Sequence, residues 1–264
     1  MNQVGLIAGS GRYPQFLFAQ LRKAGVGVQV AAIQGQVNPA DFTGASDYST
    51  FPIGRFRDVA RYFRAARIAC VYMAGGIHKH GMWRHVSVDR HGLSLLPQLL
   101  RGGDDRLLRA VAHRFRALGI IIEDPRCFLD DALAGSGVLA GPAPNDKMST
   151  MILSAWKSTR LLALEDTGQS IVWFGNRVSE VEGSDGTDAL LSRAPGPGAI
   201  LVKYVKCHQD RRFDLPAIGP STVLAAKQVG ARAIVVETGG VLMLDKERLT
   251  SLCNESGLLL FGIS

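Results

Sequence analysis

The chain has 264 residues, a net charge of +7 and 47% hydrophobic residues. This length suits one large domain or two modest ones, and no apolar run approaches the ~20 residues that a membrane-spanning helix needs. The positive charge suits a nucleic acid, an anionic membrane surface or a phosphorylated substrate, and composition does not choose among them. The four cysteines form no C-x-x-C pair and the first residues lack the basic region of a signal peptide, so we expect free thiols and a cytoplasmic protein.

The first third of the chain alternates apolar strand candidates with amphipathic helices. We expect strands at residues 4–8, 26–33, 68–74 and 120–122, and helices at 14–24, 56–66 and 104–119. This alternation predicts an α/β fold whose N-terminal domain is a Rossmann-like parallel sheet with helical crossovers, over residues 1–132.

The turn after the first strand contains Gly9, Ser10, Gly11 and Arg12. Glycines permit close backbone approach there, and the following helix offers N–H groups to a phosphate. A full dinucleotide motif would have a third glycine at Pro14 and an acidic residue after the second strand, and both are missing, which counts against NAD. A nucleotide held without that ribose contact and a tight turn with no ligand both fit.

Two other polar groups allow a structural and a functional interpretation. His78 and His80 resemble part of a metal site, but no matching set of ligands completes it, and a polar loop explains them equally simply. Asp104 and Asp105 begin a helix, which they would cap and stabilise, or they would face a cation or a ribose.

Residues 133–146 are rich in Ala, Gly and Pro, and we interpret them as an interdomain linker. Beyond it, residues 147–264 are expected to form a distinct C-terminal α/β domain that carries catalysis. It would begin with a helix over 147–164 and a hairpin, 170–174 with 177–181, that turns through Gly175 and Asn176.

The stretch from Lys203 to Thr222 follows an apolar run, so its charges come where a buried strand would end, which is where ligands often bind in α/β proteins. Its cations suit a diphosphate and its two carboxylates suit a metal ion, although a surface loop with ion pairs would look the same. A second turn, with Asp188 beside Gly186 and Thr187, begins a helix that could hold a phosphate. The candidates in the stretch are Lys203, Lys206, Gln209, Asp210, Arg211, Arg212 and Asp214.

Several motifs together resemble one bacterial family, the UDP-2,3-diacylglucosamine pyrophosphatases of the lipid A pathway that are unrelated to the calcineurin-like phosphoesterase version. The motifs are LIAGSGRYP (6–14), GDDRLL (103–108), EGSDGTDAL (182–190), LVK (201–203), QDRRFDLPAIGPST (209–222) and VETGG (236–240). The resemblance runs essentially end to end. Cys207, where the family is expected to have proline, and the segment 78–91 depart from it.

The resemblance implies a hydrolase that cleaves UDP-2,3-diacylglucosamine to UMP and 2,3-diacylglucosamine 1-phosphate, by metal-assisted attack of water on the sugar-side phosphorus. Carried over by motif, it makes Asp214, Asp210 and Asp188 the catalytic candidates. Asp214 and Asp210 would bind Mg²⁺ or another divalent metal. The substrate-binding candidates are Gly9, Ser10, Gly11, Arg12, Asp104, Asp105, Gly186, Thr187, Lys203, Lys206, Gln209, Arg211 and Arg212.

The expected partners are the lipid-linked nucleotide sugar and, through peripheral contact, the cytoplasmic face of the inner membrane; no nucleic acid is expected. Base rates for oligomers allow a homodimer. Two alternatives stand beside this interpretation: a non-catalytic nucleotide or phospholipid-binding regulatory protein, and an NAD-dependent oxidoreductase that the glycine turn argues against.

Overall fold

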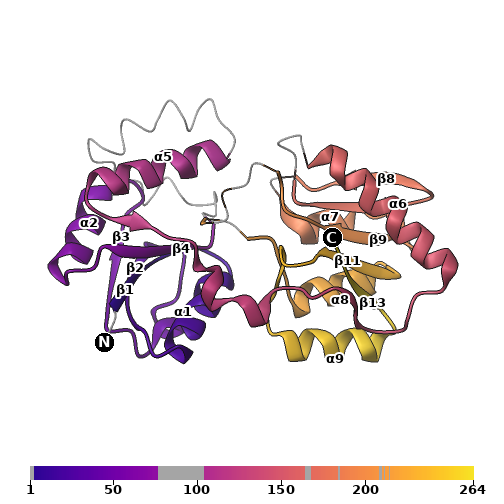
Figure 1. Cartoon of the computed structure of the whole chain (residues 1–264), viewed down its shortest axis with the longest axis horizontal. Helices are drawn as coiled ribbons and strands as arrows, with labels where there is room; N and C mark the ends of the chain where they lie inside the picture. Colours follow the sequence, from indigo (N-terminus) through magenta and orange to yellow (C-terminus); the bar gives the residue numbers. More distant parts are fainter. Residues whose placement is uncertain are drawn as a thin grey trace. The chain divides into compact units, whose positions relative to one another are not determined.

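The computed structural model describes residues 3–76, 104–163, 168–183, 185–207, 210, 212–213 and 215–264, and these form two compact units (Figure 1). Unit 1 contains the described residues up to Leu129, together with Asp210, Arg212 and Phe213. Unit 2 contains the described residues from Asp130 onward, apart from those three. The chain of unit 2 therefore contributes a short segment to unit 1.

Unit 1 is built on a five-stranded sheet in which every neighbouring pair is parallel, in the order β3-β2-β1-β4-β5. The strands are β1 (Gln3–Ala8), β2 (Gly27–Ile33), β3 (Asp47–Phe51), β4 (Cys70–Ala74) and β5 (Ile121–Ile122). The strand order reverses between β1 and β4. In doubly wound sheets this is the point where ligands bind.

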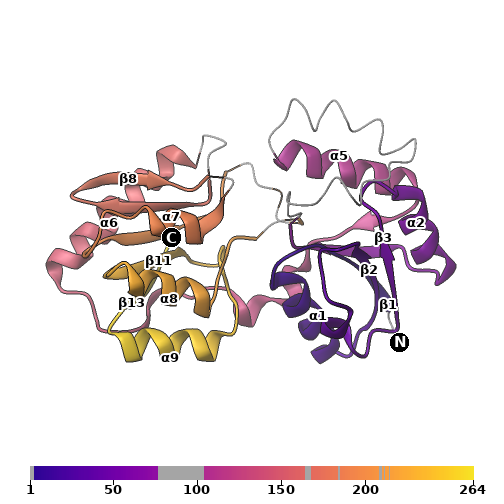
Figure 2. The same ribbon diagram turned by 180° about the vertical axis from the view of Figure 1, so that it is seen from behind.

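Helices cover both faces of this sheet (Figures 1 and 2). Helix α1 (Tyr13–Lys23) connects β1 to β2 and buries Leu17 and Leu21 completely. Helices α2 (Phe56–Ala65) and α5 (Asp104–Ala117) share another apolar cluster, in which the rings of Phe56 and Phe115 lie 5.2 Å apart. Short 3₁₀ helices at Pro39–Phe42 and Pro125–Phe128 complete the described part of this unit.

Unit 2 contains a six-stranded mixed sheet in the order β6-β13-β11-β9-β7-β8. Its three central strands are parallel, and the outer strands run antiparallel to their neighbours. The strands are β6 (Gly137–Ala140), β7 (Ser170–Phe174), β8 (Arg177–Val181), β9 (Ile200–Lys203), β11 (Ala233–Glu237) and β13 (Leu259–Ile263). A small parallel pair, β10 (Ala217–Ile218) and β12 (Leu242–Met243), lies outside this sheet.

The central strands of unit 2 are buried on both faces, and their side chains alternate between two apolar clusters. Leu201 belongs to the cluster that contains α7 (Gly186–Ser192), α8 (Pro220–Gln228) and α9 (Lys246–Ser256). Its neighbours Ile200 and Val202 belong to the cluster of α6 (Asp146–Leu162) and its buried Trp156. This period of two places helices on both sides of the sheet, as Figures 1 and 2 show.

The structure differs from the expected linker over residues 133–146. Residues 137–140 form β6, which pairs antiparallel with β13, and Leu133 bridges to Leu242. A Cβ on Gly262 would collide with the carbonyl of Gly135, so a glycine here permits a close strand contact. The small residues of this segment thus allow it to pack against the sheet of unit 2 and do not make it a spacer.

Candidate functional site

The turn after β1 is joined to the turn after β4 by backbone hydrogen bonds. The N–H of Gly9 donates to Ala74 at 2.8 Å, the N–H of Ser10 donates to Gly76 at 2.7 Å, and Gly76 donates back to Ser10 at 3.1 Å. A Cβ on Gly9 would collide with the carbonyl of Gly76. The first two N–H groups of the expected phosphate turn are therefore used to hold the two loops together.

Gly11 and Arg12 follow this pair and lead into α1. Gly11 has a φ of +94° and open space where a Cβ would lie. Arg12 is exposed and occupies the N-cap position of the helix, and Pro14 lies within the first helical turn. The part of the turn open to a ligand is thus Gly11 and Arg12, at the switch point between β1 and β4.

Asp210 and Arg212 lie in unit 1 and form a two-pronged ion pair. Nε of Arg212 donates to Oδ1 of Asp210 at 2.9 Å, and Nη2 donates to Oδ2 at 2.6 Å. The hydrogen bond from Arg212 lowers the pKa of Asp210 below its usual value. Both carboxylate oxygens of Asp210 therefore have a cationic partner already.

Phe213 fixes this segment in unit 1. Its ring is buried in the apolar cluster of α2 and α5, and the guanidinium of Arg212 lies 5.1 Å from the ring centroid. A buried aromatic side chain with a cation over its face fixes the backbone on either side.

Lys203 lies at the carboxyl end of β9 in unit 2, and its side chain is buried. Nζ donates to the hydroxyl of Thr187 at 2.7 Å and to that of Ser170 at 3.0 Å, and it lies 3.7 Å from Oε1 of Glu182. An ammonium group has three donors, and three oxygens surround this one.

Glu182 is the counter-charge of Lys203 and completes a closed network. Its Oε1 accepts from Thr187 at 2.6 Å, and its Oε2 accepts from the N–H of Gln169 at 3.0 Å. Burial raises the pKa of Glu182, but the charge of Lys203 and the hydroxyl of Thr187 outweigh it, so that the pKa is lowered. The network therefore contains a buried, ionised pair.

The structure groups the sequence-predicted residues into two sets. Lys203 and Thr187 meet in unit 2, beside Gly186 at the start of α7, whereas Asp210 and Arg212 meet in unit 1. Asp188 is exposed in the first turn of α7, and Lys206 is partly exposed.

The other candidates fall outside what the structure describes. Asp104 and Asp105 begin α5, but the description of that helix does not extend to their side chains. The remaining candidates outside the described residues are Gln209, Arg211 and Asp214, and the same holds for His78 and His80.

Ser170 and Glu182 were not singled out by sequence reasoning. Ser170 lies opposite Lys203 in the antiparallel pairing of β7 with β9. Glu182 follows β8 and begins the motif at 182–190, so the motif pointed to its region although no residue type marked it. The contact depends on strand register, which local sequence does not reveal.

No group of three His, Cys, Asp or Glu side chains able to hold a metal ion is present among the described residues. The predicted metal ligand Asp210 is paired with Arg212, and the predicted ligand Asp214 lies outside the described part. The divalent metal therefore stays a prediction.

Both units are α/β units with polar residues at the ends of their strands, which is where ligands bind in open α/β sheets. The chain belongs to the LpxI family. The model "LpxI N-terminal domain" matches residues 3–132, and "LpxI C-terminal domain" matches residues 135–261.

A relative from Caulobacter vibrioides is 31% identical over 278 residues, which cover 100% of this chain and 98% of the relative. That relative is named "UDP-2,3-diacylglucosamine pyrophosphatase LpxI". The family predicted from the motifs is thereby confirmed, as is the prediction of an α/β fold with two domains.

Proposed function

We propose that this chain hydrolyses the diphosphate of UDP-2,3-diacylglucosamine, as the name of its relative states for that protein. The single observation that carries the proposal is the end-to-end match to that pyrophosphatase, which spans both units. The products would be UMP and 2,3-diacylglucosamine 1-phosphate, an intermediate of lipid A biosynthesis.

The reaction would proceed by attack of water on the sugar-side phosphorus. A bond forms between the water oxygen and that phosphorus, the bond from phosphorus to the bridging oxygen breaks, and the bridging oxygen leaves with UMP. We assign the activation of water to Asp214, and we keep Asp210 in unit 1 and Asp188 in unit 2 as further candidate catalytic carboxylates. A positioned carboxylate that accepts a proton contributes roughly 10²–10⁴-fold to such a rate.

Lys203 would act by positioning. Its ammonium is surrounded by Ser170, Thr187 and Glu182, so it holds the start of α7 against β7 and β9. Gly186 and Thr187 at that helix start would then meet a phosphate oxygen. Arg12, Lys206, Gln209 and Arg211 would supply further donors, and so would Arg212 where it is not held by Asp210.

We further propose that a divalent metal, Mg²⁺ by preference, neutralises diphosphate charge beside Asp214. This proposal depends on residues outside the described part, because Asp210 already pairs with Arg212. Asp210 would serve as a metal ligand only if that pair opens.

None of the described helices is long and apolar enough to cross a membrane. We propose that the protein meets its lipid substrate at the cytoplasmic face of the inner membrane by peripheral contact, which the net charge of +7 would favour with anionic lipid.

The test is release of UMP from UDP-2,3-diacylglucosamine by the purified full chain, in Mg²⁺ and in EDTA. Turnover that EDTA stops supports both the reaction and the metal. Asp214→Asn should lower kcat by roughly 10²–10⁴-fold without loss of folding, whereas Glu247→Gln, an exposed carboxylate of α9, should not change it. Binding of substrate without turnover in any divalent metal would instead favour a regulatory binding protein.

A further inference from the structure

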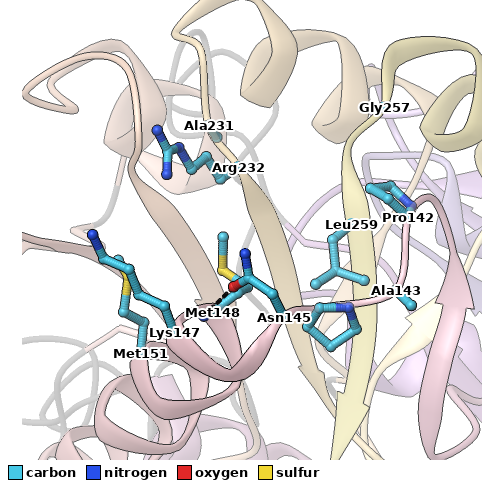
Figure 3. A pocket seen from close by; sticks show the side chains of 11 residues that line it. Pro142, Ala143, Asn145, Lys147, Met148, Met151, Ala231, Arg232, Gly257 and Leu259 are labelled. Atoms are coloured by element: carbon cyan, nitrogen blue, oxygen red, sulfur yellow. Dashed lines mark hydrogen bonds between the residues drawn. The ribbon is translucent and has the colours of Figure 1, made fainter.

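Unit 2 contains a pocket of about 320 Å³ at the edge of its sheet where the parallel strands begin (Figure 3). Its walls come from the loop that follows β6, the first turns of α6, and the residues that lead into β11 and β13. The volume lies at the lower end of the range for small-molecule sites, about 300–1,000 Å³. The pocket therefore suits a small ligand or one end of a larger one.

This pocket lies at the end of the sheet where the parallel strands begin, whereas Lys203 is the last residue of β9. Ala233, the first residue of β11, pairs with Ile200, and Val236 pairs with Lys203, so the two ends are separated by the length of these strands. At about 3.3 Å per residue, that length is on the order of 10 Å. The pocket thus belongs to another part of unit 2 than the network around Lys203.

The polar side chains of the pocket are donors. Lys147 and Arg232 are its ionisable lining residues, and both are exposed cations. Neither forms a salt bridge with a described carboxylate. In Figure 3 their charged ends lie on the same side of the pocket. Two unneutralised cations at one opening favour an anion.

Asn145 adds a third donor. Its Oδ1 accepts from the N–H of Met148 at 2.9 Å and so caps α6, as the dashed line in Figure 3 shows. The oxygen of this amide is therefore occupied, and its NH₂ group is the end that can donate to a ligand. An ammonium, a guanidinium and an amide NH₂ together match a carboxylate or a phosphate.

The remaining lining is apolar. Met148 and Met151 are half-buried on α6, Leu259 is buried at the start of β13, and Pro142 and Pro144 line the entering loop. Methionine is unbranched and flexible, so a pair of methionines adapts to an alkyl chain better than branched residues do. An inorganic anion would leave this apolar surface uncovered.

From these features we propose that the pocket binds an amphiphilic anion, a carboxylate or phosphate that carries an aliphatic chain. Arg232 and Lys147 hold the anionic group, Asn145 donates to it, and the first segment of the chain lies against Met148, Met151 and Leu259. The same head group and chain occur in a free fatty acid or alkyl phosphate and in a lipid of a membrane surface. This site does not depend on the function proposed above.

The test uses decanoate and decyl phosphate below their micelle concentrations, with the full chain carrying ¹³C-methyl methionine. The methyl resonances of Met148 and Met151, assigned with Met148→Leu and Met151→Leu, should shift and saturate with either probe. Decanol and inorganic phosphate, which each supply half of the chemistry, should bind more weakly than decyl phosphate.

Lys147→Gln and Arg232→Gln should each lower the affinity for decyl phosphate roughly tenfold, which is the loss expected for one charged hydrogen bond. Lys157→Gln is the matched control, because Lys157 is exposed on α6 but does not line the pocket. Unchanged melting temperatures keep the comparison free of folding effects. Saturable shifts that weaken in both pocket variants and not in the control support the site.

Absence of saturable shifts at Met148 and Met151, or equal affinity in the Lys147→Gln/Arg232→Gln double variant, would overturn the proposal. Co-sedimentation with anionic and with neutral vesicles then identifies the source of the ligand. Anionic vesicle binding that the double variant loses assigns the site to a membrane lipid. Vesicle binding that the double variant keeps, with decyl phosphate binding lost, assigns it to a free amphiphile.

Discussion

The two units hold the polar residues at their strand ends in different ways. In unit 1 the described residues after β1 and β4 are joined by backbone hydrogen bonds, of Gly9 with Ala74 and of Ser10 with Gly76. In unit 2 the ends of β7, β8 and β9 are joined through the side chains of Ser170, Glu182 and Lys203. The first arrangement is sensitive to a Cβ added at Gly9, and the second is sensitive to the loss of one charge.

The largest effect should follow from breaking the buried pair of unit 2. Glu182→Gln leaves the ammonium of Lys203 buried without a counter-charge, and loss of one partner of a buried ion pair costs about 3–5 kcal/mol. We expect a decrease of this size in the free energy of unfolding, measured by urea denaturation of the full chain.

The double variant Glu182→Gln/Lys203→Met tests whether the loss of stability in Glu182→Gln comes from the unpaired charge of Lys203. It removes both charges, so it should be more stable than Glu182→Gln alone. If the two substitutions instead add independently, Lys203 and Glu182 do not act as a pair.

The next largest effect concerns the glycine contact of unit 1. Gly9→Ala places a Cβ against the carbonyl of Gly76, and we expect it to lower the free energy of unfolding by about 2–4 kcal/mol. Gly11→Ala is the matched control in the same turn. It has open space but a φ of +94°, so it should cost about 1 kcal/mol from backbone strain alone. Equal losses in the two variants would show that the loop contact has no special role.

A smaller effect is expected from the ion pair of unit 1. The Arg212 side chain is 40% exposed, and exposed pairs contribute about 0–1 kcal/mol. Asp210→Asn should therefore lower the free energy of unfolding far less than Glu182→Gln does. A loss as large as that of Glu182→Gln would remove the contrast between the exposed and the buried pair.

The pH dependence of unfolding gives a second test of the buried pair of Glu182 and Lys203. The pKa of Glu182 is lowered from 4.5 in the folded state, so its contribution is complete above pH 4.5 and is lost as the pH falls through the lowered value. We expect stability to fall in acid more steeply in the wild-type protein than in Glu182→Gln/Lys203→Met. Parallel curves from pH 7 to pH 3 would show that Glu182 does not titrate in this way.

Much of the fold followed from local pattern. The hairpin of β7 and β8 has the predicted bounds, because Gly175 and Asn176 take the positive φ values, 58° and 64°, of a tight hairpin turn. By contrast, β3 (DYSTF) was missed because it is a polar edge strand, only partly buried. The strand β6 was mistaken for a linker because its small residues carry no alternating pattern.

The site was less predictable than the fold. The motifs drew attention to Lys203 and Thr187, and the structure shows a hydrogen bond between them. From the sequence, however, we expected Lys203 to be free to bind a phosphate. Its other partners, Ser170 on β7 and Glu182 just after β8, are separated from it along the chain. Asp210 likewise was expected to bind metal, and its pairing with Arg212 depends on a turn whose geometry local sequence does not specify.

The most direct measurement of the proposed function is hydrolysis of UDP-2,3-diacylglucosamine in H₂¹⁸O, with mass spectrometry of both products. We predict UMP without label and 2,3-diacylglucosamine 1-phosphate that carries one ¹⁸O, because water attacks the sugar-side phosphorus. Label in UMP would contradict the direction of attack, and absence of either product from folded protein with Mg²⁺ would contradict the hydrolase itself.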